Sequence, residues 1–316
     1  MESIALPDTT SWNGAVALSN LGFIVAHGDD AASFLHGQMS QDMTNQPSNQ
    51  ARLAAYCSAK GRMLASFQSL RPAADTYWLI TDLSVLPATL KRLSMFVLRA
   101  KVKLQDGAAS LAAVGLLGAV AADLAAGQEP GSVWADAARG GLWTRLPDVS
   151  GLVRCLWIGP KDQQQDVLAA YPAVDQASWQ WLDVVSGVPR IEAAGSDQFV
   201  PQMVNFELVG GVNFSKGCYP GQEVVARSQY RGTLKRRAFV VHGGQAMAAG
   251  QELFSAADPG QPAGMVVNAA PCPGSANWSA LVELKLNALD TALHVGAADG
   301  PQIQLGKLPY EIPSAD

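Results

Sequence analysis

The stretch that decides how this chain folds is KGCYPGQEVVAR, residues 216–227. Its two glycines allow a positive φ or a close approach of the backbone to a ligand. Pro220 suits the first position of a helix, because its missing N–H costs nothing there. Gly232 stands where a helix that ends near Tyr230 needs a left-handed cap. The stretch therefore predicts a tight loop that leads into a short helix.

Cys218 is the chemically distinctive residue of this loop. It would lie just before a helix N-terminus, with the Lys216 ammonium beside it, and both features favour a thiolate over a thiol. A buried structural cysteine beside a solvated turn is the other interpretation of the same residues. On physical grounds both stay open, because perturbed sites point to function only in a probabilistic way.

The charge around the loop is uneven. The whole chain carries −5, whereas the segment 216–237 has one acidic residue, Glu223, and six basic residues: Lys216, Arg227, Arg231, Lys235, Arg236 and Arg237. A basic segment in an acidic protein indicates an anionic partner. No RNA-binding motif and no stripe of aromatic and basic residues accompanies these charges, so direct binding of nucleic acid is not expected.

Composition sets the broad class. A chain of 316 residues, 48% hydrophobic and 16% charged, predicts a globular protein of two or three domains. The start of the chain lacks a basic, then apolar, signal-peptide pattern. The longest apolar stretch, 111–122, is too short and too rich in alanine and glycine to cross a bilayer. We expect a soluble, cytoplasmic protein without a membrane partner.

The cysteines and histidines do not form a metal-binding pattern. The four cysteines are isolated, without a C-x-x-C, and the four histidines are scattered. Such spacing supports neither a zinc site nor a stable protein-held iron–sulfur cluster. Isolated cysteines are typical of a reducing compartment.

Local patterns predict an α+β fold followed by a β-rich domain. Residues 15–26 predict a strand, or a hairpin around Asn20, and Asp29 or Asp30 can cap a helix that carries Phe34 and Leu35. Further strands are expected at 52–57, 63–70, 77–80, 111–117, 153–158 and 181–186, and further helices at 84–98, 119–126 and 161–170. Short strands at 237–242, 264–268, 278–286 and 291–295 predict a small barrel or sandwich. The expected domains are 1–106, 107–232, the two possibly interleaved, and 233–316.

The pattern K-G-C-Y-x-G-Q-E followed by R-x-x-x-R-G resembles the signature of the YgfZ folate-binding, tRNA-modifying family. Other pieces of the resemblance occur in order: FLHGQ at 34–38, KGR at 60–62, GVP at 187–189, FVPQ at 199–202 and LPY at 308–310. The family is related in fold to the glycine-cleavage T protein, an aminomethyltransferase. The resemblance implies two α/β N-terminal domains and a C-terminal β-barrel, arranged around a central opening where folate binds.

The resemblance also implies roles for individual residues. Cys218 is the expected functional thiol, with Lys216 beside it and Arg227 nearby as cationic support. The expected cofactor is tetrahydrofolate, without a stable metal or cluster. Its expected contacts are Trp179, Ser186, Lys216, Gln222, Glu223 and Arg227. For Trp179, ordinary core packing is the alternative interpretation.

Three departures from the family pattern are visible. A second tryptophan near the first strand corresponds to Leu21 here, and an acidic residue before the glycine of G-x-P corresponds to Ser186. The acidic pair that serves aminomethyl chemistry in the T protein corresponds to the apolar stretch LASF, 64–67. A developing cation on folate would lack a nearby carboxylate from this strand, so glycine-cleavage activity is not expected.

Two functional hypotheses follow. The preferred one is a folate-binding protein that supports the assembly or repair of iron–sulfur enzymes, including a tRNA methylthiotransferase, by means of the Cys218 thiol. The alternative is a folate-dependent one-carbon transferase or demethylase, in which another carboxylate, such as Glu223, replaces the missing acidic pair.

Overall fold

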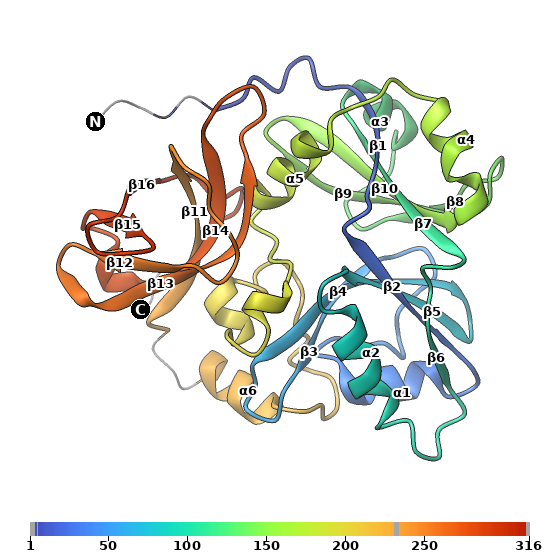
Figure 1. The fold of residues 1–316 in the computed structure, drawn as a ribbon. Coiled ribbons are helices and arrows are strands. Elements are labelled where there is room, and N and C mark those ends of the chain that lie inside the picture. The colour runs from blue at the N-terminus through green and yellow to red at the C-terminus, as the bar shows by residue number, and fades with distance from the viewer. Residues whose placement is uncertain (1–3, 5, 231–233, 314–316) are drawn as a thin grey trace.

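Two five-stranded sheets and a closed six-stranded barrel make up the fold, and all of their paired strands run antiparallel (Figure 1). The computed structural model describes residues 4, 6–230 and 234–313. In this part of the chain, no helix combines the length and the apolar character that a membrane crossing requires.

The first sheet has the strand order β3-β4-β5-β2-β6. Its strands are β2 (Leu21–His27), β3 (Arg52–Cys57), β4 (Met63–Ala73), β5 (Thr76–Asp82) and β6 (Lys103–Asp106), and its helices are α1 (Ala31–Gln38) and α2 (Leu86–Ser94). The predicted hairpin of residues 52–70 is confirmed, and its turn contains Gly61 with a φ of +73°. Helix α1 begins after Asp30, whose carboxylate accepts a hydrogen bond from the Lys101 backbone and not from the helix itself.

The second sheet has the order β1-β7-β10-β9-β8. Its elements are β1 (Gly14–Ala17), β7 (Leu111–Leu117), α3 (Ala119–Leu124), β8 (Val133–Ala135), β9 (Leu142–Val149), β10 (Leu152–Pro160), η1 (Lys161–Gln163) and α4 (Gln164–Ala169). Strand β1 pairs with β7, whereas β2 pairs with β5 and β6. The hairpin interpretation of residues 15–26 is therefore wrong. The alternation identifies both strands, but their partners are remote in sequence, and the second unit is discontinuous.

The C-terminal barrel has the order β11-β14-β13-β12-β15-β16. Its elements are β11 (Arg236–Gly243), β12 (Glu252–Ser255), β13 (Asp258–Pro271), β14 (Trp278–Lys285), η4 (Leu286–Ala288), β15 (Leu293–Val295) and β16 (Gln302–Leu305). All four strands predicted here are confirmed, while β12 and β16 were not predicted. Closure removes the free edges that an open sheet would expose.

One predicted strand is a helix. Residues 181–186 were expected to be extended, but they belong to α5 (Gln176–Val185) and its C-terminal cap. The Asp175 carboxylate accepts a hydrogen bond from the Ala177 backbone N–H at 3.1 Å, which caps this helix. Helix α5 contacts β1 of the second sheet and β13 and β14 of the barrel, so it places Trp179 where the units meet.

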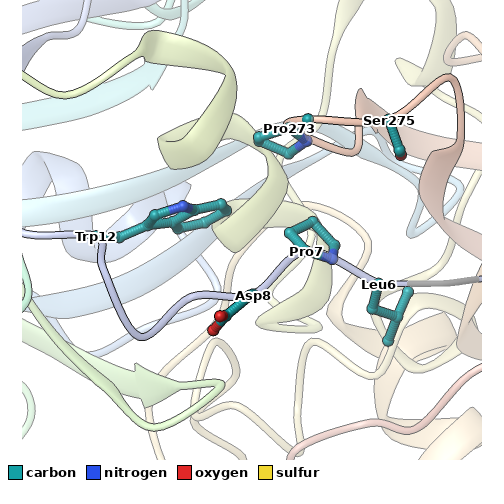
Figure 2. A pocket seen from close by; sticks show the side chains of 7 residues that line it. Leu6, Pro7, Asp8, Trp12, Pro273 and Ser275 are labelled. Atoms are coloured by element: carbon teal, nitrogen blue, oxygen red, sulfur yellow. The ribbon is translucent and has the colours of Figure 1, made fainter.

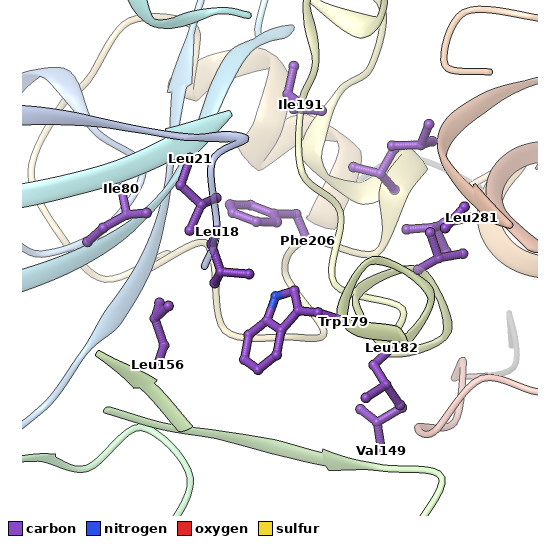
Figure 3. Close-up of a cluster of buried hydrophobic side chains, with 14 of the residues drawn as sticks. Leu18, Leu21, Ile80, Val149, Leu156, Trp179, Leu182, Ile191, Phe206 and Leu281 are labelled. Carbon is purple, nitrogen blue, oxygen red and sulfur yellow. The ribbon is translucent and has the colours of Figure 1, made fainter. Parts of the chain in front are cut away.

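One apolar cluster joins the three units (Figure 3), and each unit also has a cluster of its own. Figure 3 shows Leu18, which follows β1, and Leu21 of β2 around the same junction as Trp179 of α5, Leu281 of the barrel and Phe206. Phe206 follows the short helices η2 (Ala193–Gly195) and η3 (Pro201–Val204) of the segment that leads to α6 (Gln222–Tyr230). The central opening implied by the resemblance stays a prediction.

Candidate functional site

The segment 215–221, here named the K-G-C loop, is held against the 59–62 turn. Gly221 has a φ of +78°, and a Cβ at this position would lie 2.3 Å from the Ser58 carbonyl oxygen. At Gly61 a Cβ would lie 2.7 Å from Cβ of Val224. The two turns therefore approach each other so closely that neither position accommodates a side chain without displacement.

The loop leads into α6, as the sequence predicts, but the helix begins later than expected. It starts at Gln222, so Pro220 lies in the preceding turn and not at the first helical position. Cys218 consequently lies four residues before the helix. The cap predicted at Gly232 lies outside the described residues.

Cys218 differs from the other cysteines in exposure. It is open to solvent, whereas Cys57, Cys155 and Cys272 are buried, and all four thiols are free. Burial raises the pKa of Cys57 and that of Cys155 to about 12. Because the thiolate is the reactive form of cysteine, burial disfavours the reaction of these two thiols at neutral pH.

Lys216 fastens the K-G-C loop to the end of α1. Its Nζ donates hydrogen bonds to the carbonyl oxygens of His36 and of Met39, the latter at 2.8 Å, and lies 4.9 Å from the centre of the Tyr219 ring. Burial lowers the pKa of Lys216 to about 8, although the negative charges of Asp42 and Cys218 partly oppose the shift. The cation thus complements the partial negative charge at a helix C-terminus and stays within electrostatic reach of Cys218.

The next predicted residues lie on α6. Glu223 and Arg227 form an ion pair with each other at 2.6 Å on an exposed face of the helix. Gln222 is the first helical residue and is partly exposed. Arg227 therefore directs its charge to Glu223, and its role as support for the thiol stays a prediction.

Most of the basic segment is occupied by internal partners. Arg236 donates two hydrogen bonds of 2.8 Å to the Glu283 carboxylate, and Arg237 pairs with Glu207 in a buried position. Lys235 is exposed, while Arg231 lies outside the described residues. The surplus of charge counted along the sequence is thus larger than the charge that this segment presents to an anionic partner.

Trp179 lies in a buried cluster on α5, and only 1% of its surface is exposed. One contact is with Gly115 of β7, where a Cβ would lie 2.5 Å from the indole ring. The Arg154 guanidinium lies 5.3 Å from the ring centre. Among the described residues, neither Nε1 of Trp179 nor Nε of Arg154 has a hydrogen-bond partner. Two adjacent buried donors are therefore unsatisfied, which is uncommon in a folded protein.

Asp183 supplies the negative charge of this cluster. Its carboxylate accepts hydrogen bonds from Arg154 at 2.9 Å and from Arg190 at 3.0 Å. Burial lowers the pKa of Arg154, and the Asp183 carboxylate opposes that shift. Asp183 was not predicted as a site residue from the sequence. The signal that was available was an arginine within the otherwise apolar strand 152–160, which requires a partner when it is buried.

The three positions that depart from the family pattern have structural contacts. The Ser186 hydroxyl donates to the Asp183 carbonyl at 2.6 Å and accepts from the Val188 N–H at 3.2 Å, so it stabilises the turn at Gly187. Leu21 belongs to the same apolar core as Trp179. In 64–67, Ser66 accepts a hydrogen bond from the Ile191 backbone at 2.9 Å.

The predicted residues thus fall into two groups. Lys216, Cys218, Gln222, Glu223 and Arg227 lie on the K-G-C loop and α6, and Trp179 and Ser186 lie at α5 with Asp183. His36 and Asp42, which received no chemical role from the sequence, also lie near the loop. No set of three metal-ligating side chains gathers in residues 4, 6–230 and 234–313.

Two surface pockets lie elsewhere. One, of about 400 Å³, is lined by the segment that includes Leu6 and Trp12 and by the barrel turn 273–275 (Figure 2). The other, of about 290 Å³, lies between Arg62 and the barrel residues Arg236 and Glu283. Neither pocket is lined by a predicted site residue.

The chain has clear relatives in sequence. No protein-family model matches it. It is 34% identical over 244 residues to the tRNA-modifying protein YgfZ of Vibrio vulnificus strain CMCP6, which covers 75% of this chain and 72% of that protein. It is 32% identical over 262 residues to the tRNA-modifying protein YgfZ of Cronobacter sakazakii, which covers 75% and 74%.

A solved structure has the same fold. The glycine cleavage system aminomethyltransferase T from Bartonella henselae superposes with a TM-score of 0.74, covers 95% of this chain and 87% of its own, and is 15% identical. The expected architecture, with α/β N-terminal units and a C-terminal barrel, is thereby confirmed.

Proposed function

The chain belongs to the family of the tRNA-modifying protein YgfZ, and from this premise we propose that it is a folate-binding protein that supports tRNA modification through the Cys218 thiol. Its clients in this proposal are iron–sulfur enzymes such as a tRNA methylthiotransferase. The observation that carries the proposal is the contrast among the cysteines: Cys218 is exposed on the family signature, and the other three are buried. A thiol that is presented in this way can meet a partner protein or a small molecule.

Folate is proposed to bind beside Trp179. The unsatisfied Nε1 of Trp179 and Nε of Arg154 fit a ligand that carries hydrogen-bond acceptors, and folate has them on its pterin and on its glutamate. Ser186 stands at the position of the family's acidic residue. Asp183, one helical turn earlier, offers a carboxylate in its place. When bound, tetrahydrofolate supplies nitrogen atoms that carry one-carbon units. Trp179, Arg154 and Asp183 would hold it and exclude water.

The folate proposal is tested by isothermal titration with tetrahydrofolate under anaerobic conditions. Trp179→Phe keeps an aromatic ring and removes the indole N–H, so we expect affinity to fall about tenfold, the value of one lost hydrogen bond. Trp157→Phe is the matched control, because the Trp157 N–H is also buried but donates to the Gly140 carbonyl. An equal loss in both variants, or no binding by the wild type, contradicts the proposal.

The role of the thiol is tested in a strain that lacks its own family member. Cys218→Ser keeps the size of the side chain and removes the sulfur, so we expect no recovery of iron–sulfur enzyme activity in cell extracts. Cys272→Ala alters a buried cysteine and should restore activity as the wild type does. Full recovery with Cys218→Ser would exclude a role for the sulfur atom.

A further inference from the structure

The ring of His36 lies against the K-G-C loop. His36 is on α1, two residues before this helix ends, and a Cβ added at Gly217 would lie 3.4 Å from its Nε2. Gly217 directly precedes Cys218, and consecutive α-carbons are about 3.8 Å apart. The imidazole edge that carries Nε2 therefore faces the backbone that presents the exposed thiol.

Asp42 determines which nitrogen of His36 carries the proton. Nδ1 of His36 lies 3.0 Å from Oδ1 of Asp42 and 2.7 Å from the Thr44 hydroxyl, which itself donates to the same carboxylate oxygen at 2.9 Å. Burial alone would raise the pKa of Asp42, but hydrogen bonds from Asn45, Thr44 and His36 outweigh it and hold the pKa far below its ordinary value. The carboxylate is thus ionised and can only accept, and the Thr44 hydroxyl gives its one proton to that carboxylate, so Nδ1 of His36 is the donor to both oxygens. In the neutral ring, the lone pair is then on Nε2, on the side of the loop.

Charged groups from two segments lie around His36. Lys216 donates to the His36 carbonyl oxygen, and its ammonium lies within electrostatic reach of both Asp42 and Cys218. The carboxylate comes from the segment after α1, and the ammonium and the thiol come from the loop packed against that helix. A cation beside a thiolate and a carboxylate behind an imidazole are the arrangement that activates nucleophilic cysteines.

We propose that His36 is the base that takes the proton from Cys218, with Asp42 as the residue that orients it. The S–H bond of Cys218 breaks, an N–H bond forms at Nε2, and the electron pair stays on sulfur. The Asp42 carboxylate stabilises the resulting imidazolium through Nδ1–H, and no other reactant is consumed. The product is a thiolate ready for an electrophilic sulfur or carbon atom of a partner. The inference deepens the proposed function, because it concerns the same thiol.

The test measures the alkylation rate of Cys218 by iodoacetamide between pH 5.5 and 9, with mass spectrometry of the peptide that contains it. His36→Asn keeps an N–H that can donate to Asp42 and removes Nε2. We expect the rate at pH 6.5 to fall about tenfold and the midpoint of the pH profile to rise by about one unit. Asp42→Asn should give a smaller loss, because the ring keeps Nε2 but loses its orientation.

The control is His27→Asn. His27 also has an aspartate and a threonine at Nδ1, at 3.5 Å from Asp75 and 3.0 Å from Thr76, and it lies at the end of β2. This variant should keep the wild-type profile. In urea all variants should react at one rate, and circular dichroism verifies their fold. A wild-type pH profile in His36→Asn overturns the inference. Alkylation needs neither folate nor a client enzyme. That result would therefore reject the role of His36 without rejecting the role of the Cys218 thiol, which the cellular test of Cys218→Ser measures separately.

Discussion

The K-G-C loop and the Trp179 cluster differ in the partners of their cations and in their exposure to solvent. In the loop, the Lys216 ammonium meets neutral carbonyl oxygens, and the Cys218 thiol beside it is open to solvent. In the cluster, the Arg154 guanidinium is buried against the Asp183 carboxylate, and two nearby donors, which have no partner in the part of the chain that the structure describes, are shielded from water. The two regions thus differ in exposure, and this difference supports the proposal that the loop presents the thiol while the cluster binds folate.

The largest expected effect sharpens the contrast in exposure. Under native conditions, a thiol reagent such as 5,5′-dithiobis(2-nitrobenzoate) should modify one cysteine per chain at least about a hundredfold faster than the other three, because buried thiols are rarely ionised. Mass spectrometry should locate the label at Cys218. Fast labelling of Cys57 or Cys155 would show that the buried regions open readily, which contradicts the contrast.

A substitution in the Trp179 cluster should cost the most stability. Asp183→Asn leaves the Arg154 charge buried without its counter-ion, and the expected loss in the free energy of unfolding is about 3 kcal/mol. Urea denaturation measures the loss. Glu223→Gln breaks an exposed ion pair on α6 and should cost no more than about 0.5 kcal/mol. Similar losses in the two variants would remove the distinction between the regions.

Two glycine substitutions in the K-G-C loop test whether close packing, and not position in the loop alone, determines the loss of stability. Gly221→Ala should cost about 2 kcal/mol, because its φ is +78° and the added Cβ would lie 2.3 Å from a backbone oxygen. Gly217→Ala places a Cβ at an ordinary contact distance of 3.4 Å, so its cost should stay below about 0.5 kcal/mol. Thermal unfolding compares the two variants. Equal costs would contradict the packing of the two turns.

The smallest expected effect concerns the pKa of Lys216 and its contribution to the free energy of unfolding. Its pKa of about 8 lies below the ordinary value of 10.5, so between these pH values the unfolded chain binds more protons than the folded chain. The contribution of Lys216 to the free energy of unfolding therefore rises with pH across this window. Carbon-13 NMR of labelled lysines should find one residue that titrates near pH 8. Asp42→Asn should lower this pKa further, because the carboxylate raises it; an upward shift would refute the assigned contacts.

Much of the fold was predictable because its signals are local. Gly61 between two alternating segments predicted the hairpin of 52–70, and turn residues between short apolar runs predicted most of the barrel. One error arose where a remote partner decides, because strand β1 joins β7 about a hundred residues later in the sequence. The other error concerned a local signal, since the Asp175 cap that places 181–185 in a helix was not recognised.

The candidate site residues also divide into those that a local pattern predicts and those that depend on remote partners. The signature around Cys218 is contiguous, so sequence alone identified it. His36 meets the loop through Lys216, which is 180 residues away in the sequence, and Arg154 gains Asp183 from a different element. The proposed folate contacts, the alternative of a one-carbon transferase and the cytoplasmic location stay predictions. Turnover of a methylamine with added tetrahydrofolate would establish that alternative.

The most direct test of the central claim is the content of methylthiolated nucleosides in tRNA. The tRNA is isolated from a strain that lacks its own family member and expresses either the wild-type chain or Cys218→Ser at equal protein levels. Chromatography with mass spectrometry measures the modified nucleosides. The account predicts that the wild type restores them and that Cys218→Ser leaves them at the level of the empty strain. Equal restoration by both proteins would contradict it.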